Sequence, residues 1–444
     1  MKVALITLGC PKNLVDAEVM MGLLDEEGHE LTGEVLDADV AVVNTCSFIA
    51  AAVEESRGVI EDCLTLKRQG TLGAVVVAGC LPQRYGEDTL RMFPDVDAVV
   101  GCSAFEEIAG ALATLSRPGA DVIVREPSSI YDHRSPRILG TPSHLAYVKI
   151  AEGCDNRCAY CTIPRIRGPL RSRDPDSVLA EAGELASMGV VELNVIAQDT
   201  TAYGTDIAPT TSLVELLRRL ARVGVPWLRL LYTHPAHVTD ELLSVLSDEV
   251  TLVPYLDVPI QHIADGVLHA MGRLSDGAQI RALLERARAT VPGLTIRSSV
   301  MLGFPGETEA DFEELLEFVL AGYVDHLGVF EFSPEPGTRA ADLPGQIDRE
   351  ATSRRATAVH SAALRLSRAR GERLLGSELE VLCDAPGAGR TAGQAWEMDG
   401  VVRWDPRALC APPPGAFARV LVTSADGFDL EAVPLPARSG TSGG

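Results

Sequence analysis

Short apolar runs alternate with longer amphipathic stretches along most of this 444-residue chain. In the first third, three runs rich in β-branched residues have the pattern of parallel strands buried on both faces. These runs are Val3–Leu8, Val40–Val43 and Ala74–Ala78. Helical periodicity fills the intervals, as in Asp16–Glu27 and Ala52–Arg68. The order β-α-β-α-β predicts an open parallel α/β sheet over residues 1–135.

The alternation resumes at Leu145 and continues to about Leu343. The expected strands are Ala146–Ile150, Glu192–Ala197, Trp227–Leu231, Tyr255–Val258, Thr295–Val300 and His326–Phe330. The expected helices include Pro175–Met188, Ser212–Val223, Thr239–Ser247, Asp276–Thr290 and Glu309–Ala321. Six β/α units predict a partial parallel barrel over residues 140–372, whose functional groups gather at the carboxyl ends of the strands.

The last part of the chain changes pattern. An Ala/Arg/Leu-rich stretch, Asp348–Leu375, predicts one long helix. Three short strand-like runs follow between Gly- and Pro-rich turns, at Ser377–Cys383, Glu397–Trp404 and Ala416–Val422. They predict a small β-barrel over residues 376–440. We expect the Ser/Gly tail, Arg438–Gly444, to be disordered. The fold class is therefore an α/β multidomain protein of three parts.

Composition indicates an ordinary soluble chain, with 46% hydrophobic and 23% charged residues. No apolar run reaches the ~20 residues that a membrane span needs. The first ten residues are apolar but lack a small-residue cleavage site, so a buried strand is a better interpretation than a signal peptide. Ten cysteines in such a chain favour metal ligands in a reducing cytoplasm over disulfides.

The formal net charge is −23, and acidic residues outnumber basic ones in each of the three parts. No segment carries the basic patch expected of a nucleic-acid-binding protein. An acidic surface favours a basic partner through electrostatic complementarity. Taken alone, however, the charge is explained equally well by solubility.

Three cysteines stand at Cys-x3-Cys-x2-Cys spacing directly after the expected strand Ala146–Ile150. Thiolates at this spacing can bind three irons of a 4Fe–4S cube from one loop and leave the fourth iron open to substrate. The alternative is a zinc site, but zinc normally takes four ligands, and the next histidine is His234. We therefore predict an iron–sulfur cluster held by Cys154, Cys158 and Cys161.

A second set of cysteines follows the three expected strands of the first part. Cys10, Cys46 and Cys80 each come directly after a strand and a small or polar residue. Carboxyl ends of parallel strands meet at one edge of a sheet, where ligands bind. This placement predicts a second three-cysteine cluster. Cys63 falls within the expected helix Ala52–Arg68. Cys102 follows a fourth apolar run, Ala98–Gly101, which allows it a place near the same edge, but we expect it to be a bystander. We expect Cys383 and Cys410 to be small buried apolar residues.

Other strand ends carry weaker signals. Gly303 and Gly306 follow the fifth barrel strand and allow a close backbone approach. Gln261 and His262 follow the fourth strand, although a structural role for the histidine is as good an interpretation. Gln198 and Asp199 follow the second strand. His234 and His237 receive no role.

Five arginines crowd the Cys154 loop and are able to pair with a carboxylate, although a solvated basic loop is the better interpretation for most of them. They are Arg157, Arg165, Arg167, Arg171 and Arg173.

The loop Cys154–Cys161 resembles the signature of the radical S-adenosylmethionine superfamily. In that superfamily the open iron binds S-adenosylmethionine, and an electron from the cluster splits the sulfonium to give a 5′-deoxyadenosyl radical. The resemblance implies a pocket for this cofactor. The candidate contacts to it are Tyr160, Gln198, Gln261, Gly303 and Gly306.

Nearly the whole chain resembles the methylthiotransferase family, which joins a three-cysteine N-terminal domain, a radical S-adenosylmethionine barrel and a C-terminal TRAM β-barrel. The stretch Leu8–Asp16 is similar to the RimO branch, which acts on a ribosomal protein; the tRNA-modifying branch tends to show Gly-Cys-Gln-Met-Asn there. Ala197–Gly204 and Glu397–Val402 are also RimO-like.

This resemblance implies two 4Fe–4S clusters, two roles for S-adenosylmethionine, and methylthiolation of an aspartate β-carbon in the twelfth small-subunit ribosomal protein. It also implies an electron donor such as flavodoxin or ferredoxin, and no membrane partner.

Three alternatives share parts of this pattern. A tRNA adenosine methylthiotransferase would use the same six cysteines, although the branch motifs and the acidic charge make tRNA an improbable partner. A radical enzyme that only methylates would not need Cys10. A redox-sensing iron–sulfur protein would need no adenosyl pocket. The sequence leaves open the sulfur donor, the reductant, the oligomeric state, and whether the substrate is free or ribosome-bound.

Overall fold

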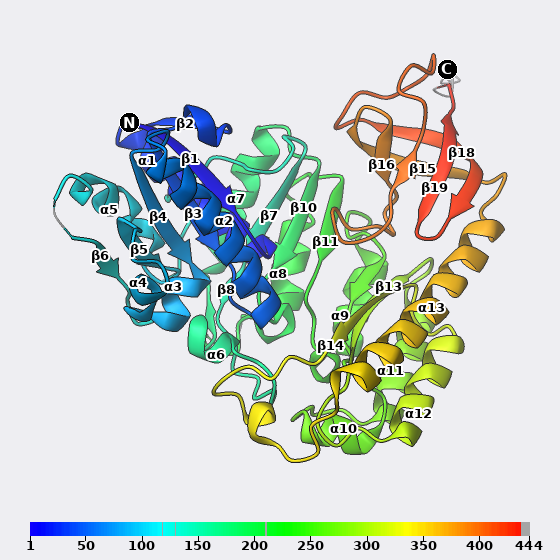
Figure 1. The fold of residues 1–444 in the computed structure, drawn as a ribbon. Coiled ribbons are helices and arrows are strands. Elements are labelled where there is room, and N and C mark those ends of the chain that lie inside the picture. The colour runs from blue at the N-terminus through cyan, green and yellow to red at the C-terminus, as the bar shows by residue number, and fades with distance from the viewer. Residues whose placement is uncertain (118, 129, 209–210, 437–444) are drawn as a thin grey trace.

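The computed structural model describes residues 1–117, 119–128, 130–208 and 211–436. It contains a parallel α/β sheet, a partial β/α barrel and a closed β-barrel, in that order along the chain (Figure 1). The fold class expected from the sequence is thus confirmed. The tail Arg438–Gly444 lies outside the described residues. Within them, no helix combines the length and the apolarity needed to cross a bilayer.

The N-terminal sheet has six parallel strands in the order β2-β1-β3-β4-β5-β6. They are β1 (Lys2–Thr7), β2 (Glu30–Thr32), β3 (Val40–Thr45), β4 (Ala74–Gly79), β5 (Ala98–Gly101) and β6 (Asp121–Ile123). Every residue of β3, β4 and β5 is buried, as their β-branched composition predicts. The helices are α1 (Pro11–Glu26), α2 (Ala50–Arg68), α3 (Cys80–Tyr85), α4 (Asp88–Met92) and α5 (Ile108–Thr114). Because Pro11 suits the first turn of a helix, α1 begins earlier than expected.

The central part has six parallel strands in sequence order, β7 (Leu145–Lys149), β10 (Glu192–Ile196), β11 (Trp227–Leu230), β12 (Tyr255–Asp257), β13 (Thr295–Leu302) and β14 (His326–Glu331). The ladder divides between β11 and β12, where only Leu228 bridges Leu252. Its helices are α6 (Ile163–Ile166), α7 (Pro175–Ser187), α8 (Leu213–Leu220), α9 (Asp240–Asp248), α10 (Asp265–Ala270), α11 (Gly277–Thr290) and α12 (Glu309–Leu320). A short hairpin, β8 (Ala151–Glu152) and β9 (Arg171–Ser172), closes the loop after β7. The predicted partial barrel is confirmed.

The long helix α13 (Arg349–Arg373) runs beside the central part and leads to the C-terminal barrel (Figure 1). That barrel closes in the order β15-β16-β17-β19-β18. Its strands are β15 (Glu378–Ala385), β16 (Ala388–Arg390), β17 (Val402–Arg403), β18 (Phe417–Asp426) and β19 (Asp429–Pro434). The strand expected over Glu397–Trp404 was wrong for most of its length, because residues 391–400 pack instead against the central strands.

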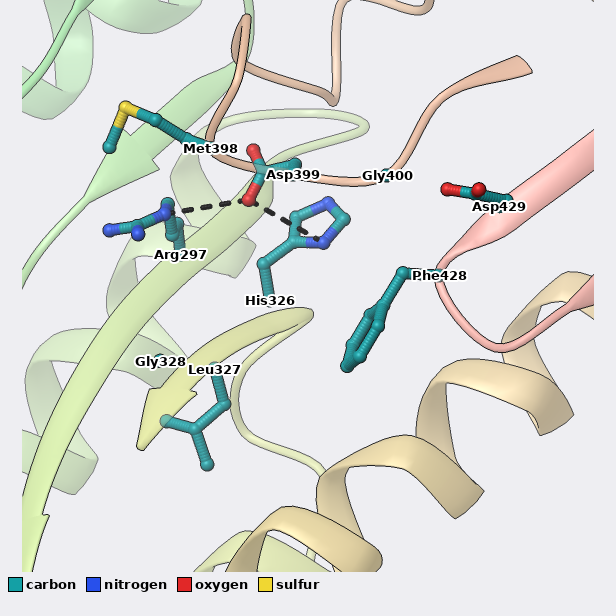
Figure 2. Close-up of a pocket in the computed structure, with 9 residues that line it drawn as sticks. All are labelled: Arg297, His326, Leu327, Gly328, Met398, Asp399, Gly400, Phe428 and Asp429. Carbon is teal, nitrogen blue, oxygen red and sulfur yellow. Dashed lines mark ion pairs between the residues drawn. The ribbon is translucent and has the colours of Figure 1, made fainter. Parts of the chain in front are cut away.

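Residues 391–400 fasten the C-terminal barrel to the central one. Arg229 donates to the carbonyl of Ala392 at 2.7 Å, and Tyr255 donates its hydroxyl to Asp399 at 2.6 Å. Asp399 also lies between Arg297 and His326, beside a cavity of about 330 Å³ that Phe428 lines as well (Figure 2). The polar groups of this junction are largely paired with one another, so it joins the two parts.

Candidate active site

Cys10, Cys46 and Cys80 meet at one edge of the N-terminal sheet. Each follows a strand, and β1, β3 and β4 are neighbours. The backbone at Gly9 lies so close to Cys46 that a Cβ on Gly9 would be 2.9 Å from the Cys46 Sγ. Burial, together with the neighbouring Cys80 and Cys10 thiols, raises the pKa of Cys46 to about 12. The sequence argument therefore placed these three thiols correctly.

Cys102 lies at the same edge, as its place after an apolar run allowed, and its role as a bystander stays a prediction. It follows β5, whose last residue, Gly101, pairs with Gly79 at the end of β4. The Cys102 thiol is buried against Cys80, and its hydrogen bond lowers the pKa of Cys80 to about 7, with Arg167 adding to the shift. The sequence signal for this position is the apolar run Ala98–Gly101, which directly precedes Cys102.

The remaining cysteines lie elsewhere. Cys63 is buried in α2, and Cys383 is buried in β15, as expected. Cys410 is half-exposed, so its interpretation as a buried apolar residue was wrong. It lies in the turn-rich stretch between β17 and β18, which the sequence pattern does not place inside or outside the barrel.

The second triplet lies in the loop that follows β7 and β8. Cys154 donates its backbone N–H to the carbonyl of Gly168 at 3.1 Å and so closes the base of this loop. Gly153 is required there, because it has φ of 80° and a Cβ would lie 2.0 Å from the Pro169 oxygen. Cys154, Cys158 and Cys161 are half-buried, and burial together with the other two thiols raises the pKa of Cys161 to about 12.

Both triplets offer the donor set of an iron–sulfur cluster. In the described part of the chain, no three His, Cys, Asp or Glu side chains are arranged around a single metal ion. A cubic cluster needs no such arrangement, because each thiolate binds a different iron. Triplets of neighbouring thiols fit that geometry better than a zinc site does. Ligation by these six cysteines stays a prediction.

The loop of the second triplet packs directly on the edge that carries the first. Thr162, the residue after Cys161, donates its hydroxyl to the carbonyl of Phe48 at 3.1 Å. Arg167 of the same loop donates to the Cys80 Sγ at 3.2 Å, and the Cys102 thiol lies 3.7 Å from the Ile166 carbonyl. The two thiol triplets thus border the same interface between the N-terminal sheet and the central barrel.

A buried ion network spans this interface. Arg167 pairs with Asp16 of α1 at 2.5 Å and with Glu152 at 3.3 Å, and it also donates to Asn13. Lys149, at the end of β7, pairs with the same two carboxylates. Burial lowers the pKa of Lys149, but the carboxylates outweigh it and the net shift is upward. Asp16 therefore pairs with both cations across the domain boundary, and Glu152 pairs with both within the central part.

The five arginines near the Cys154 loop differ in their exposure to solvent. Arg157 and Arg165 are exposed and Arg171 is half-buried. Arg167 and Arg173 are buried, and Arg173 pairs with Glu181 at 2.5 Å. A solvated basic loop, expected for most of the five, therefore describes Arg157 and Arg165 but not Arg167 and Arg173, because buried carboxylates neutralise these two.

Four of the five predicted cofactor contacts lie near one another. Tyr160 belongs to an apolar cluster with Met301 and Phe304, which places it beside the turn that contains Gly303 and Gly306. Gln261 bridges Val300 and has a left-handed backbone, with φ of 72°. Gln198 lies apart from this group: it donates to Glu152, and its amide oxygen is buried with no partner among the described residues.

The turn after β13 is held by residues that the sequence argument missed. Gly303, with φ of 78°, donates its N–H to Glu307 at 2.8 Å, and Glu307 pairs with Arg355 of α13 at 2.7 Å. His262 is buried: its Nδ1 accepts from the N–H of Ala264, and its Nε2 lies 3.8 Å from Glu307 without a hydrogen-bond partner among the described residues. The signal that could have indicated Glu307 is a carboxylate directly after a Gly-Phe-Pro-Gly turn.

Asp199 orders the Cys154 loop. Its Oδ2 accepts a hydrogen bond from Asn156 at 2.7 Å and lies 3.2 Å from the Nδ1 of His237, a residue to which no role was assigned. His234 stacks against His237 at 4.8 Å between ring centroids. Nothing in the spacing of these residues along the chain indicates that they meet.

Comparison with known proteins gives three successive family matches. Residues 2–101 match the Uncharacterized protein family UPF0004, residues 148–319 match the Radical SAM superfamily, and residues 375–435 match the TRAM domain. Similar solved structures include the radical S-adenosylmethionine methyltransferase TsrM from Kitasatospora setae, with a TM-score of 0.56 and 17% identity over 93% of this chain and 84% of that one. That likeness concerns the fold alone.

Curated relatives align over almost the full length. The ribosomal protein uS12 methylthiotransferase RimO of Myxococcus xanthus is 43% identical over 96% of this chain and 90% of its own length. The protein of the same name from Pelotomaculum thermopropionicum is 41% identical over 97% of this chain and 98% of its own.

Proposed function

Because the chain belongs to the RimO family of radical S-adenosylmethionine methylthiotransferases, we propose that it transfers a methylthio group to the β-carbon of an aspartate in ribosomal protein uS12, the twelfth protein of the small subunit. The family uses S-adenosylmethionine and a 4Fe–4S cluster. The observation that carries the proposal for this chain is the direct packing of the Cys154 loop on the edge that holds Cys10, Cys46 and Cys80.

Each triplet has its own task in this proposal. Cys154, Cys158 and Cys161 hold the cluster that binds S-adenosylmethionine, and Cys10, Cys46 and Cys80 hold a second cluster that carries the sulfur. When bound, these groups supply the electron, the hydrogen-abstracting radical and the methylated sulfur. The chain positions them. Arg167 and Thr162 hold the Cys154 loop against the edge of the N-terminal sheet, and the buried ion network excludes water from this interface.

The cofactor pocket is assigned to residues around the Cys154 loop. Tyr160 and the Gly303–Gly306 turn contribute apolar and backbone surface, and Gln261 contributes its strained strand end. The unpaired amide oxygen of Gln198 is available to accept a hydrogen bond from the amino group of the methionine end.

The partner assignments rest on charge. A net charge of −23 suits a basic ribosomal protein through complementarity and works against tRNA, so the tRNA alternative is not favoured. We propose that the enzyme acts in the cytoplasm, on free or ribosome-bound uS12, with flavodoxin or ferredoxin as the electron donor.

The test is reconstitution under anaerobic conditions with iron, sulfide, S-adenosylmethionine and reductant, followed by intact mass spectrometry of uS12. A tRNA pool is incubated in parallel. The proposal predicts one methylthio group on uS12, located on an aspartate by fragmentation, and unmodified tRNA. Modification of tRNA alone would overturn the substrate assignment, and methylation without sulfur would overturn the reaction.

A further inference from the structure

Lys12 is a buried cation without a counter-ion. Its side chain, on the second residue of α1, is only 8% exposed, and its Nζ lies 3.1 Å from the centroid of the Tyr232 ring. The chain has four lysines. Lys2, Lys67 and Lys149 each pair with a carboxylate, as the ion pairs Lys2–Glu30, Lys67–Asp97 and Lys149–Asp16.

In the described structure, Lys12 has neither a carboxylate within 4 Å nor a hydrogen-bond acceptor. Burying an unpaired ammonium is unfavourable, so such a group is expected where an anion is to be received.

The surroundings of Lys12 place it in the region between the two triplets. It lies two residues after Cys10, whose thiol has the largest charge effect on it, followed by Asp257 of β12, Glu152 of β8 and Arg167 of the Cys154 loop. The Asp257 carboxylate has other partners: it accepts hydrogen bonds from the backbone N–H of Tyr232 at 2.8 Å and from Arg297 at 3.1 Å. The ammonium is therefore held at the interface without being neutralised by its neighbours.

Tyr232 is fixed in an unfavourable backbone conformation. Its φ of 61° lies in the left-handed region, which non-glycine residues rarely adopt. The hydrogen bond to Asp257 holds this conformation, and it keeps the ring against Lys12. Strain maintained in this way is typical of functional sites. A ring face stabilises an ammonium by a cation–π contact and leaves N–H donors for another ligand.

We propose that Lys12 binds the side-chain carboxylate of the target aspartate and thereby presents the adjacent β-carbon between the two thiol triplets. This assignment rests on the proposed function, because the substrate side chain is an aspartate only in that reaction. A charge-assisted hydrogen bond between ammonium and carboxylate supplies both affinity and orientation. Lys12 is thus a positioning residue for the substrate. The competing role is to offset the charge of thiolates near Cys10.

The experiment measures binding of fluorescently labelled uS12 to the reconstituted full-length enzyme by anisotropy. Two forms of uS12 are compared, the natural protein and one with the target aspartate replaced by asparagine. We expect the wild-type enzyme to bind the aspartate form about tenfold more tightly. Lys12→Met should bind both forms equally, and Lys12→Arg should keep part of the preference. Lys67→Met, which alters a lysine of α2, is the matched control and should behave as wild type.

The result that would overturn the assignment is an unchanged preference for aspartate in Lys12→Met, or no preference in the wild-type enzyme. Iron content and visible absorption are measured in every variant. A specific loss of iron in Lys12→Met would assign the residue to the N-terminal thiolates and overturn the proposal. If wild-type enzyme fails to modify uS12 at all, the proposed function itself is wrong; if it modifies uS12 while Lys12→Met keeps the preference, only the role of Lys12 is wrong.

Discussion

Several charged side chains in the interior of this protein are paired across a domain boundary. Asp16 and Lys149 are separated by 133 residues, and Asp16 and Arg167 by 151, yet they form one network. The sequence carries a partial signal for it, because Lys149 interrupts the apolar run Ala146–Ile150. Its partners were not predictable, since pairing depends on how the N-terminal sheet docks on the central barrel.

His262 makes the stability of the protein depend on pH. Burial lowers the pKa of this imidazole to about 4, below the usual value of 6.5. Between these two values the unfolded chain takes up a proton that the folded chain does not, so acidification favours unfolding. From pH 7 to pH 5 the loss from this residue is ~2 kcal/mol.

The variant His262→Asn keeps an acceptor for the N–H of Ala264 but does not titrate. We expect its midpoint of thermal unfolding to fall less than that of wild type between pH 7 and pH 5. Because all other groups titrate equally in the two proteins, parallel curves would show that His262 does not contribute.

At the scale of elements, periodicity predicted the central strands of both parallel layers but not the edges. The strands β3 and β4 are buried throughout and mostly apolar, so their composition identifies them. The edge strands β2 and β6 have three residues each and little apolar surface, so they give no periodic signal. Cys10, Cys46 and Cys80 were correctly placed together because parallel topology brings their strand ends to one edge, whereas Cys154, Cys158 and Cys161 are close because they share one loop.

Substitutions in the turn after β13 separate backbone strain from steric overlap at the proposed cofactor pocket. A Cβ on Gly303 would lie 2.2 Å from the Thr352 Oγ1 of α13, whereas a Cβ on Gly306 has no neighbour within 4 Å. Both glycines have positive φ, so Gly306→Ala reports the backbone strain of ~1–2 kcal/mol alone.

We expect Gly303→Ala to weaken binding of S-adenosylmethionine at least tenfold, and Gly306→Ala to weaken it less. Equilibrium dialysis with reconstituted enzyme measures both affinities. Equal effects of the two substitutions would mean that contact with α13 does not shape this pocket.

Loss of one cysteine from either triplet should impair a different step of the reaction. Cys158→Ala should abolish cleavage of S-adenosylmethionine, measured as 5′-deoxyadenosine. Cys46→Ala should allow cleavage but prevent thiolation of uS12. Cys63→Ala, which removes a buried thiol of α2, is the control and should retain both reactions. Loss of cleavage to the same extent in Cys158→Ala and Cys46→Ala would contradict separate roles.

At the scale of the whole molecule, the C-terminal barrel is held by ion pairs that no local pattern indicates. Glu192 of β10 pairs with Arg229 at 2.8 Å and with Arg390 of β16 at 2.7 Å, and all three side chains are fully buried. The sequence predicted a small barrel, but the strand that it assigned to residues 397–404 was wrong for most of its length. Residues 391–400 contact the central part instead of the barrel. The attachment of the C-terminal barrel depends on residues far apart in sequence, so hydrophobic periodicity does not predict it.

Glu192→Ala should destabilise the attachment of the C-terminal barrel. It leaves the buried guanidinium of Arg229 without a counter-charge, at a cost of ~3–5 kcal/mol, whereas Arg390 keeps its pair with Asp384 at 2.7 Å. We expect a lower midpoint of thermal unfolding and faster proteolysis within residues 391–400. The control is Asp426→Ala, which removes the exposed ion pair with Arg368 and should cost less than ~1 kcal/mol. Similar losses in the two variants would argue against a central role for Glu192.

The central claim is that this chain creates a radical on the β-carbon of an aspartate in a ribosomal protein and places a methylthio group there. The most direct measurement uses uS12 whose aspartates carry deuterium at the β-carbon, with mass spectrometry of both products. The account predicts one deuterium in 5′-deoxyadenosine for each methylthio group gained by uS12. Methylthiolated uS12 formed without transfer of deuterium, or deuterium transfer that requires no uS12, would contradict it.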